Sequence, residues 1–433
     1  MASVTEHPAP LADLSPDELA QVRTQAAADY EALRDRGLSF DLTRGKPGPE
    51  QLDLSDRLLQ LPTQAKDASG ADTRNYGNLK GITEIREMFA ELLSVDVQQL
   101  VAQGNSSLTI MKDVLVMLLL HGGVDSERPW STEEKVRFVC PVPGYDRHFA
   151  LLESFGIEML TAPMGEDGPD AEAIAAMVKD DPSIKGMWVV PTYANPSGAV
   201  TTLEVASRLV GMETAAPDFK IFWDNAYALH HLTEEESKSA DILSLAEAAG
   251  HPHRPFMFAS TSKITYAGAG VAFLAASTAQ IEWYLRYLGM GSIGPDKVNQ
   301  LRHVELFGSP QGVRDLMAKH REILAPKFAA VDAALRKRLK GRGVATWVAP
   351  KGGYFVNLEV MDGIATRVVQ LAKEAGIALT PAGSSHPYKQ DPDDRYIRLA
   401  PSYPSLAEVT EAMDGVAVCV LLAATEKLSG QPV

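Results

Sequence analysis

The sequence predicts an α/β fold, in which a large domain has a mostly parallel central sheet between helices and a smaller α+β domain lies beside it. The first observation is a set of short apolar runs that alternate with helical stretches from about residue 81 onward: 136–139, 186–190, 221–223 and 256–258. Such runs are typical of a parallel sheet that is buried on both faces. The second is the length of 433 residues, which exceeds what one hydrophobic core usually organises. The third is a change of pattern after about Gly308.

The N-terminal segment, residues 1–60, is expected to join the smaller domain. Residues 15–36 have the pattern of an amphipathic helix that begins at Ser15 as its N-cap and carries acidic residues in its first turn. A loop follows at 41–48, because two glycines and a proline end regular structure there.

We place the large, cofactor-binding domain at residues 61–309 and the small C-terminal domain at 310–433. The small domain begins with a helical pattern over 311–339, which we expect Pro326 to interrupt and kink. A strand, a helix, a strand and a final helix are then predicted, in that order, at 354–358, 365–375, 396–399 and 405–424.

The charge and the apolar runs exclude several classes of partner. The chain carries 41 basic and 56 acidic residues, a formal net charge of −15, which disfavours nucleic acids and anionic membranes. The longest apolar runs, 114–120 and 416–425, are shorter than the roughly 20 residues of a membrane span. Residues 1–10 have neither the basic start nor the apolar stretch of a signal peptide. We therefore expect a cytoplasmic protein.

The sequence argues against a metal site. Cys140 and Cys419 are too few for a disulfide framework or a zinc cluster, and Cys140 is expected to be a buried thiol. The histidines at 230–231 and 251–253 have no cysteine or carboxylate cluster beside them. We interpret these histidines as exposed loop residues.

Polar segments follow the four apolar runs directly, at 143–148, 191–198, 224–227 and 260–263. Ligands of open α/β sheets bind outside the carboxyl ends of the strands. The four segments are therefore expected to line one site.

Lys263 is the strongest single candidate for catalysis, since it lies in a loop of small residues directly after a buried strand. Desolvation lowers the pKa of such a lysine and frees its amine for Schiff-base chemistry. An isolated lysine in a glycine-rich turn would more often be a surface residue, so the interpretation depends on its neighbours.

Asp224 ends an apolar strand, where burying a carboxylate costs free energy unless the group meets a cation or several hydrogen-bond donors. The ring nitrogen of pyridoxal phosphate would meet this need, because the protonated ring acts as an electron sink. Tyr227 and Asn195 could both reach the phenolic oxygen of that cofactor. A structural role stays open for each of them: a helix cap, a core tyrosine, and an asparagine in a turn.

A phosphate site is indicated at 104–108, directly before a predicted helix at 109–120. The free N–H groups of a helix N-terminus and the hydroxyls of Ser106 and Ser107 suit a phosphate ester, although serine is also an ordinary N-cap. The chain has no GxGxxG in a strand–turn–helix setting and no GxxxxGK[ST], so dinucleotide and P-loop sites have no basis.

Together these residues resemble the fold-type I pyridoxal-phosphate aminotransferases, and most of all the aspartate aminotransferases of type Ic. The resemblance runs from about Asp41 to Met413. Its anchors follow the order of the family: Tyr76 with Gly81, 195–198, 224–227, 260–263 and 396–399. It implies transfer of the amino group of aspartate to 2-oxoglutarate through a Schiff base of pyridoxal 5′-phosphate.

The resemblance implies that the cofactor is bound by Tyr76, Ser106, Ser107, Tyr145, Asn195, Asp224, Tyr227, Ser260 and Lys263. Lys263 would carry the cofactor as a Schiff base and move the proton between Cα and C4′. Asp224 would pair with the ring nitrogen, with His148 as its support. Asn195 and Tyr227 would pair with O3′, and Tyr227 counts with Lys263 and Asp224 as catalytic.

Further roles follow from the same resemblance. Tyr145 would stack on the cofactor ring, and Ser106, Ser107 and Ser260 would hold the phosphate. Tyr76 would reach the phosphate of the neighbouring subunit, which implies a homodimer.

The substrate-binding residues implied are Arg398, Asn195, Gly45 and Arg44. Arg398 would bind the α-carboxylate through a bidentate fork. For the distal carboxylate of a dicarboxylic substrate, Arg44 is the first candidate and Arg147 the second.

Two departures from the family pattern concern the phosphate. Many relatives have an arginine shortly after the lysine, whereas residues 268–273 contain no basic residue, and the loop 105–107 differs from the commoner glycine-containing version. The alternative functions are a transaminase of the same fold for alanine or aromatic amino acids, and a β-lyase. A non-enzymatic regulatory protein would have no physical use for Lys263, Asp224 and Arg398 together.

Overall fold

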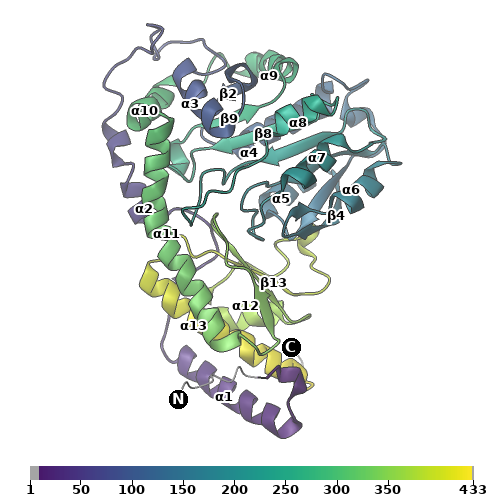
Figure 1. Cartoon of the computed structure of the whole chain (residues 1–433), viewed down its shortest axis with the longest axis vertical. Coiled ribbons are helices and arrows are strands. Elements are labelled where there is room, and N and C mark those ends of the chain that lie inside the picture. Colours follow the sequence, from purple (N-terminus) through teal and green to yellow (C-terminus); the bar gives the residue numbers. More distant parts are fainter. Residues whose placement is uncertain (1–8, 432–433) are drawn as a thin grey trace.

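The computed structural model describes residues 9–431, so the signal-peptide expectation for residues 1–10 falls almost wholly outside it. Figure 1 shows an upper part built around a large sheet and a lower part that contains α1 (Pro16–Arg34) and α13 (Leu406–Leu428). The long helix α11 (Pro310–Leu339) runs from one part to the other.

The upper part contains an eight-stranded sheet of order β2-β9-β8-β7-β6-β3-β4-β5. Neighbouring strands from β8 through β4 pair in parallel, whereas β9 pairs antiparallel with both β8 and β2, and β5 pairs antiparallel with β4. The strands are β2 (Leu100–Ala102), β3 (Arg137–Val142), β4 (Glu158–Gly165), β5 (Gly168–Pro169), β6 (Ile184–Val189), β7 (Lys220–Asp224), β8 (Pro255–Ser260) and β9 (Ala272–Ala275). The mostly parallel sheet is thus confirmed, and the four apolar runs lie in β3, β6, β7 and β8 except for Val136 and Val190 at the run ends.

Helices cover both faces of this sheet because successive strand residues point to opposite sides. In β7, Ile221 and Trp223 belong to one core cluster and Phe222 to another. The first cluster includes residues of α3, α6, α7, α8 and α10, and the second includes residues of α4, α5 and α9. The helices are α3 (Thr83–Leu93), α4 (Ser107–His121), α5 (Asp146–Ser154), α6 (Ala171–Val178), α7 (Leu203–Gly211), α8 (Ile242–Ala248), α9 (Thr278–Gly291) and α10 (Lys297–Phe307).

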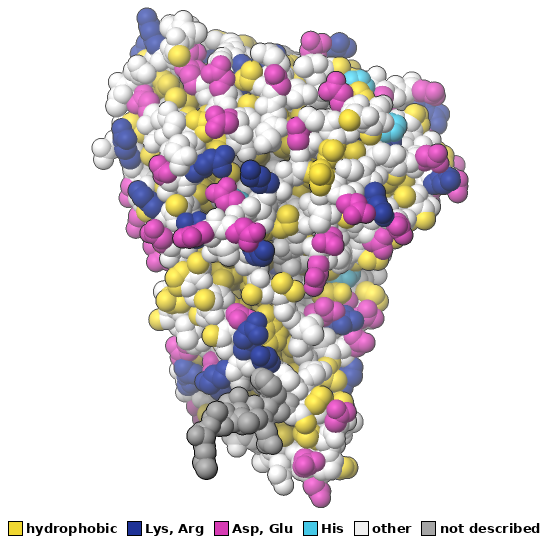
Figure 2. Space-filling view, in the orientation of Figure 1, with side chains coloured by type: hydrophobic (Ala, Val, Ile, Leu, Met, Phe, Trp, Pro, Cys, Tyr) yellow, Lys and Arg dark blue, Asp and Glu magenta, His cyan; other side chains and the backbone are white. Residues whose placement is uncertain are grey.

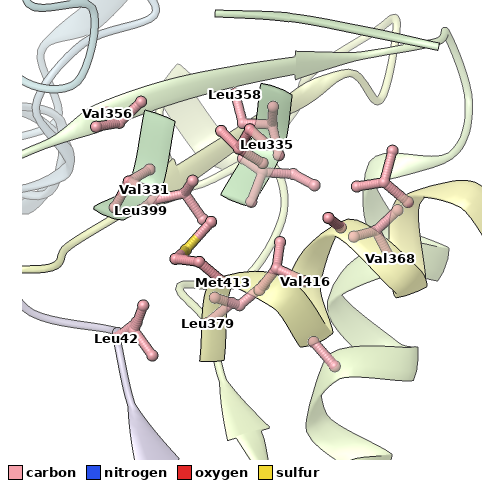
Figure 3. Packing of buried hydrophobic residues seen from close by; sticks show 14 of the residues in the cluster. Leu42, Val331, Leu335, Val356, Leu358, Val368, Leu379, Leu399, Met413 and Val416 are labelled. Atoms are coloured by element: carbon pink, nitrogen blue, oxygen red, sulfur yellow. The ribbon is translucent and has the colours of Figure 1, made fainter. Parts of the chain in front are cut away.

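The lower part is built on the three-stranded antiparallel sheet β10-β11-β13. Its elements are β10 (Ala345–Trp347), β11 (Val356–Val360), α12 (Ala365–Glu374), β13 (Tyr396–Leu399) and α13. Figure 3 shows its core, where side chains such as Val331, Val356, Val368, Leu399 and Met413 meet from α11, β11, α12, β13 and α13.

The N-terminal segment packs on this lower part. Helix α1 is capped by Ser15 as expected, and Leu33 near its end lies against Gly415 of α13. Strand β1 (Phe40–Asp41) pairs in parallel with β12 (Ile377–Ala378). The short helix α2 (Pro49–Asp53) follows, and 3₁₀ turns occupy Leu11–Asp13, Asp56–Gln60, Val97–Gln99, Trp130–Thr132, Ala267–Ala269 and Pro387–Lys389.

Helix α11 runs without a break from Pro310 to Leu339, so Pro326 does not interrupt it, while the kink expected at Pro326 stays a prediction. Proline removes one backbone donor from a helix and crowds the preceding turn. Leu324, Lys327 and Phe328 on either side are buried, so tertiary packing holds both neighbouring turns in place.

The surface mixes charges of both signs, as Figure 2 shows for one face. None of the helices within residues 9–431 is long and apolar enough to cross a membrane. Cys140 is fully buried, as predicted.

Candidate active site

A cavity of about 270 Å³ opens at the carboxyl ends of the parallel strands. It brings together most of the residues predicted for the site: Ser106, Ser107, Tyr145, Asn195, Asp224, Tyr227, Ser260 and Lys263. These residues come from separate segments of the chain, and they meet because β7 and β8 are parallel and end at the same edge of the sheet.

Asp224 is the last residue of β7 and is almost completely buried. Its Oδ2 accepts a hydrogen bond of 2.9 Å from Nε2 of His148, whose ring stacks on Trp188 at a centroid distance of 4.0 Å. Its Oδ1 is buried and has no hydrogen-bond partner. Such a carboxylate oxygen costs free energy unless a donor meets it, so the arrangement fits the protonated nitrogen of a bound ring.

Lys263 follows β8 and reaches the cavity, where its Nζ lies 4.8 Å from the centroid of the Tyr227 ring. Desolvation lowers the pKa of the Lys263 amine, and the negative charge of Asp224 opposes this shift. Burial, together with Tyr145 and Asp224, raises the pKa of the Tyr227 hydroxyl well above its usual value. In this site burial therefore disfavours the charged form of the Lys263 amine and the ionised form of the Tyr227 hydroxyl.

Arg398 on β13 belongs to the lower part but reaches toward the cavity. Its Nη1 donates to Oδ1 of Asp146 at 2.7 Å and to Oδ1 of Asn195 at 3.5 Å. Its Cζ lies 5.0 Å from the centroid of the Phe355 ring, and its Nε is buried without a partner. The amide Nδ2 of Asn195 is also buried and unpartnered. Both groups are thus free to donate to a bound molecule.

Hydroxyls and a helix N-terminus form the other end of the cavity. Ser106 caps α4 by accepting from the Thr109 amide, and Ser107 is the first residue of that helix. Ser260 Oγ donates to Ser262 Oγ at 3.0 Å, and Ser262 Oγ donates to the carbonyl of Asn105 at 3.2 Å. Among the residues that the structure describes, Lys263 is the only lysine or arginine in the cavity lining, so this end of the cavity is built from neutral donors.

Besides His148 and Arg398, whose contacts are given above, four predicted residues do not line the cavity. The side chain of Tyr76 is 81% exposed, and Arg44 and Arg147 are exposed too. Gly45 lies so close to the ring of Phe355 that a Cβ at this position would approach its Cζ to 2.3 Å. Because Phe355 also contacts Arg398, the loop around Gly45 borders the Arg398 end of the site.

The lining also contains Asn105 and Ser262, which lie in the predicted segments 104–108 and 260–263 but have no individual role assigned from the sequence. Ala267 lines the cavity as well and lies outside all of the predicted segments. The interpretation of the histidines as exposed was wrong: His230 is only 3% exposed, and His231, His251 and His253 are half-buried. His230 packs against the Tyr354 ring at a centroid distance of 5.6 Å, and its Nε2 lies 3.3 Å from the carbonyl oxygen of Lys263.

Comparisons with known proteins all find aminotransferases. A family model described as aspartate amino-transferase matches residues 14–432. A Mycolicibacterium smegmatis protein named as an aminotransferase is 57% identical over 418 residues, 96% of this chain and 97% of that protein. The aspartate aminotransferase of Corynebacterium glutamicum is 53% identical over 418 residues, 96% of each chain. A crystal structure of an aspartate transaminase from C. glutamicum matches with a TM-score of 0.95 at 52% identity, covering 97% of this chain and 99% of that one.

Proposed function

The chain belongs to the aspartate amino-transferase family, and we propose that it transfers the amino group of aspartate to 2-oxoglutarate with pyridoxal 5′-phosphate as its cofactor. Membership of this family makes it an aminotransferase. The observation that carries the cofactor proposal is the unpartnered Oδ1 of Asp224, buried in the same cavity as the Lys263 amine. The aspartate aminotransferase that is 53% identical supports the choice of substrate.

The residues of the cavity fit this cofactor at each of its ends. Asp224 would hold the ring nitrogen, and the free Nδ2 of Asn195 would donate to O3′ together with the Tyr227 hydroxyl. Ser106, Ser107, Ser260 and Ser262 would bind the phosphate, with the N–H groups at the start of α4, and Tyr145 would lie against the ring.

When bound, the cofactor supplies an electron sink for the pair left at the substrate Cα. Lys263 would take the proton from Cα, since desolvation keeps its amine available as a base. Asp224 would keep the ring nitrogen protonated, held in place by His148. Arg398 would orient the substrate through its α-carboxylate.

The proposal is tested with the purified protein and a panel of amino donors, each with 2-oxoglutarate. We expect glutamate formation to be fastest with aspartate and to require pyridoxal phosphate. A higher rate with alanine or an aromatic amino acid would contradict the proposal that aspartate is the preferred amino donor. Release of ammonia without consumption of 2-oxoglutarate would indicate a β-lyase instead.

Arg398→Lys is expected to raise KM for both aspartate and 2-oxoglutarate roughly tenfold or more, because a charge-assisted hydrogen bond contributes about 1.5–3 kcal/mol. Both substrates carry the α-carboxylate, and lysine cannot reproduce the two parallel donors of a guanidinium. Steady-state kinetics with each substrate varied in turn measure the effect. The control is Arg395→Lys, since Arg395 pairs with Glu359 away from the cavity. A KM change confined to one substrate would argue against this role of Arg398.

Arg44→Ala is expected to lower the ratio of kcat/KM for aspartate over alanine about tenfold. The variant removes a cation that would bind the distal carboxylate of aspartate, and alanine has no such carboxylate. Arg44 is exposed, in the loop whose Gly45 touches Phe355 beside Arg398. Arg147→Ala is the matched comparison, since Arg147 is also exposed and lies next to Asp146 on α5. An unchanged ratio in the Arg44 variant would show that Arg44 does not bind the distal carboxylate.

We also propose a cytoplasmic homodimer in which Tyr76 contacts the cofactor phosphate of the other subunit. Tyr76, Met290 and Ile293 are highly exposed apolar residues. The segment around Tyr76 is joined to the start of α10 by Lys297, whose Nζ donates to the carbonyls of Asn75 and Gly77 on either side of Tyr76. The division into a cofactor domain at 61–309 and a second domain at 1–60 and 310–433 is part of this proposal. Light scattering, which measures the mass in solution, tests the dimer.

A further inference from the structure

The backbone of Lys263 and its neighbour is held by buried side chains on the side away from the cavity. The carbonyl oxygen of Lys263 accepts from the Tyr354 hydroxyl and from His230 Nε2, each at 3.3 Å. The next carbonyl, that of Ile264, accepts from His320 Nε2 at 3.0 Å. Tyr354 directly precedes Phe355 and β11, and His320 lies on α11, so the donors come from elements far away in the sequence.

Gln51 of α2 joins two of these donors to each other. Its Nε2 donates to Nδ1 of His320 and to the Tyr354 hydroxyl oxygen, both at 2.9 Å. Its Oε1 accepts from the amide of Gly48 at 3.1 Å. Gln51 and Tyr354 are fully buried, and His320 is 1% exposed.

The acceptors allow a single arrangement of protons in this cluster. A carbonyl can only accept, so His320 donates from Nε2 and accepts from Gln51 at Nδ1. For the same reason the Tyr354 hydroxyl donates to Lys263 and accepts from Gln51. Every polar group of the three side chains is therefore satisfied, which is the condition under which a buried network defines one geometry.

The cluster carries no net charge near neutral pH. Burial lowers the pKa of His320 to about 4, and burial raises that of the Tyr354 hydroxyl far above its usual value. A second proton on His320 would also make its Nδ1 a donor that faces another donor, the Nε2 of Gln51. The cluster can therefore act on Lys263 through position and not through a change of charge.

The same cluster is connected to the substrate side of the site. Gly48, whose amide is held by Gln51, ends the loop that contains Arg44 and Gly45. Gly45 lies against Phe355, the neighbour of Tyr354, and the Phe355 ring lies beside Arg398. The loop that contains Arg44 and Gly45 and the peptide of Lys263 thus share one set of buried contacts.

We propose that Gln51, Tyr354 and His320 form a positioning cluster, which fixes the Lys263–Ile264 peptide and thereby aims the Lys263 amine at the reacting carbon. This inference rests on the proposed function, because it assigns the cluster to the lysine of that reaction. None of the three residues is itself part of the cavity lining, so their effect should appear in the rate of reaction and not in substrate binding.

Tyr354→Phe tests the proposal, since it removes one hydroxyl and leaves the ring in place. We expect kcat for aspartate to fall about tenfold with KM changed less than twofold. We also expect the circular dichroism of the visible cofactor band to change, because this signal reports how the lysine-bound cofactor is oriented. The control is Tyr30→Phe, which removes another buried hydroxyl that donates to a backbone carbonyl, that of Leu371 at 3.1 Å. Thermal unfolding of both variants measures the loss of stability.

Gln51→Leu provides a second, independent disruption, and the double variant Gln51→Leu/Tyr354→Phe tests whether the residues act together. We expect each single variant and the double variant to lose a similar factor in kcat, because members of one unit are not additive. Wild-type kcat and dichroism in Tyr354→Phe would overturn the proposal, as would an equal fall in kcat in Tyr30→Phe. A wild-type protein that does not transaminate aspartate would overturn the proposed function instead, so the two failures are distinguishable.

Discussion

Replacing Lys263 with alanine is expected to abolish the visible absorbance of the lysine–cofactor Schiff base and to reduce transamination by at least about 10⁴-fold. Acid–base catalysis by a positioned group contributes about 10²–10⁴-fold, and loss of the covalent attachment adds to this. No other lysine lines the cavity in the described part of the chain, so no second amine can replace it. Absorbance spectra of the reconstituted variant and a transaminase assay measure both effects.

Lys112→Ala is the control for this variant. Lys112 lies on α4, the helix that begins at the cavity, but its side chain is 48% exposed and pairs with Asp113. We expect its spectrum and activity to match those of the wild type. If the Lys263 variant still forms a cofactor adduct that borohydride can reduce, the assignment of Lys263 is wrong.

Asp224→Ala is expected to lower turnover on the order of 10²-fold or more and to weaken cofactor binding. Removing one partner of a buried charged pair costs about 3–5 kcal/mol, and an unprotonated ring accepts electrons poorly. The variant also leaves Nε2 of His148 without its acceptor. Titration of the apoprotein with pyridoxal phosphate measures binding, and single-turnover kinetics with aspartate measure the rate.

Asp218→Ala is the matched control, because Asp218 is also a buried carboxylate. It lies two residues before Lys220, the first residue of β7, whereas Asp224 is the last. Asp218 accepts from Trp130 Nε1 at 2.8 Å and from Ser126, far from the cavity lining. We expect this variant to lose thermal stability while the intact fraction keeps its cofactor affinity. Near-normal turnover in the Asp224 variant would rule out pairing with the ring nitrogen.

The strands and the strand-end residues could be predicted because their signals are local. The run 221–223 is short and apolar since β7 is covered on both faces, and Asp224 follows it at the sheet edge where open α/β sheets generally bind ligands. Ser15 and Asp224 were both found from neighbouring residues alone. The unbroken course of α11 through Pro326 has the opposite cause, because distant packing partners outweigh the local preference of proline.

The sequence by itself therefore determined the parallel sheet, the edge at which the site lies and the lysine–aspartate pair at its centre. Only the tertiary structure decided what surrounds that pair. The contact of Arg398 with Asp146 spans the two parts of the molecule, and Gln51 meets His320 and Tyr354 from elements hundreds of residues away. The burial of His230 has the same origin. Hydrogen bonds between segments so far apart leave no periodic trace in the sequence, because their geometry is set by how the helices and sheets pack.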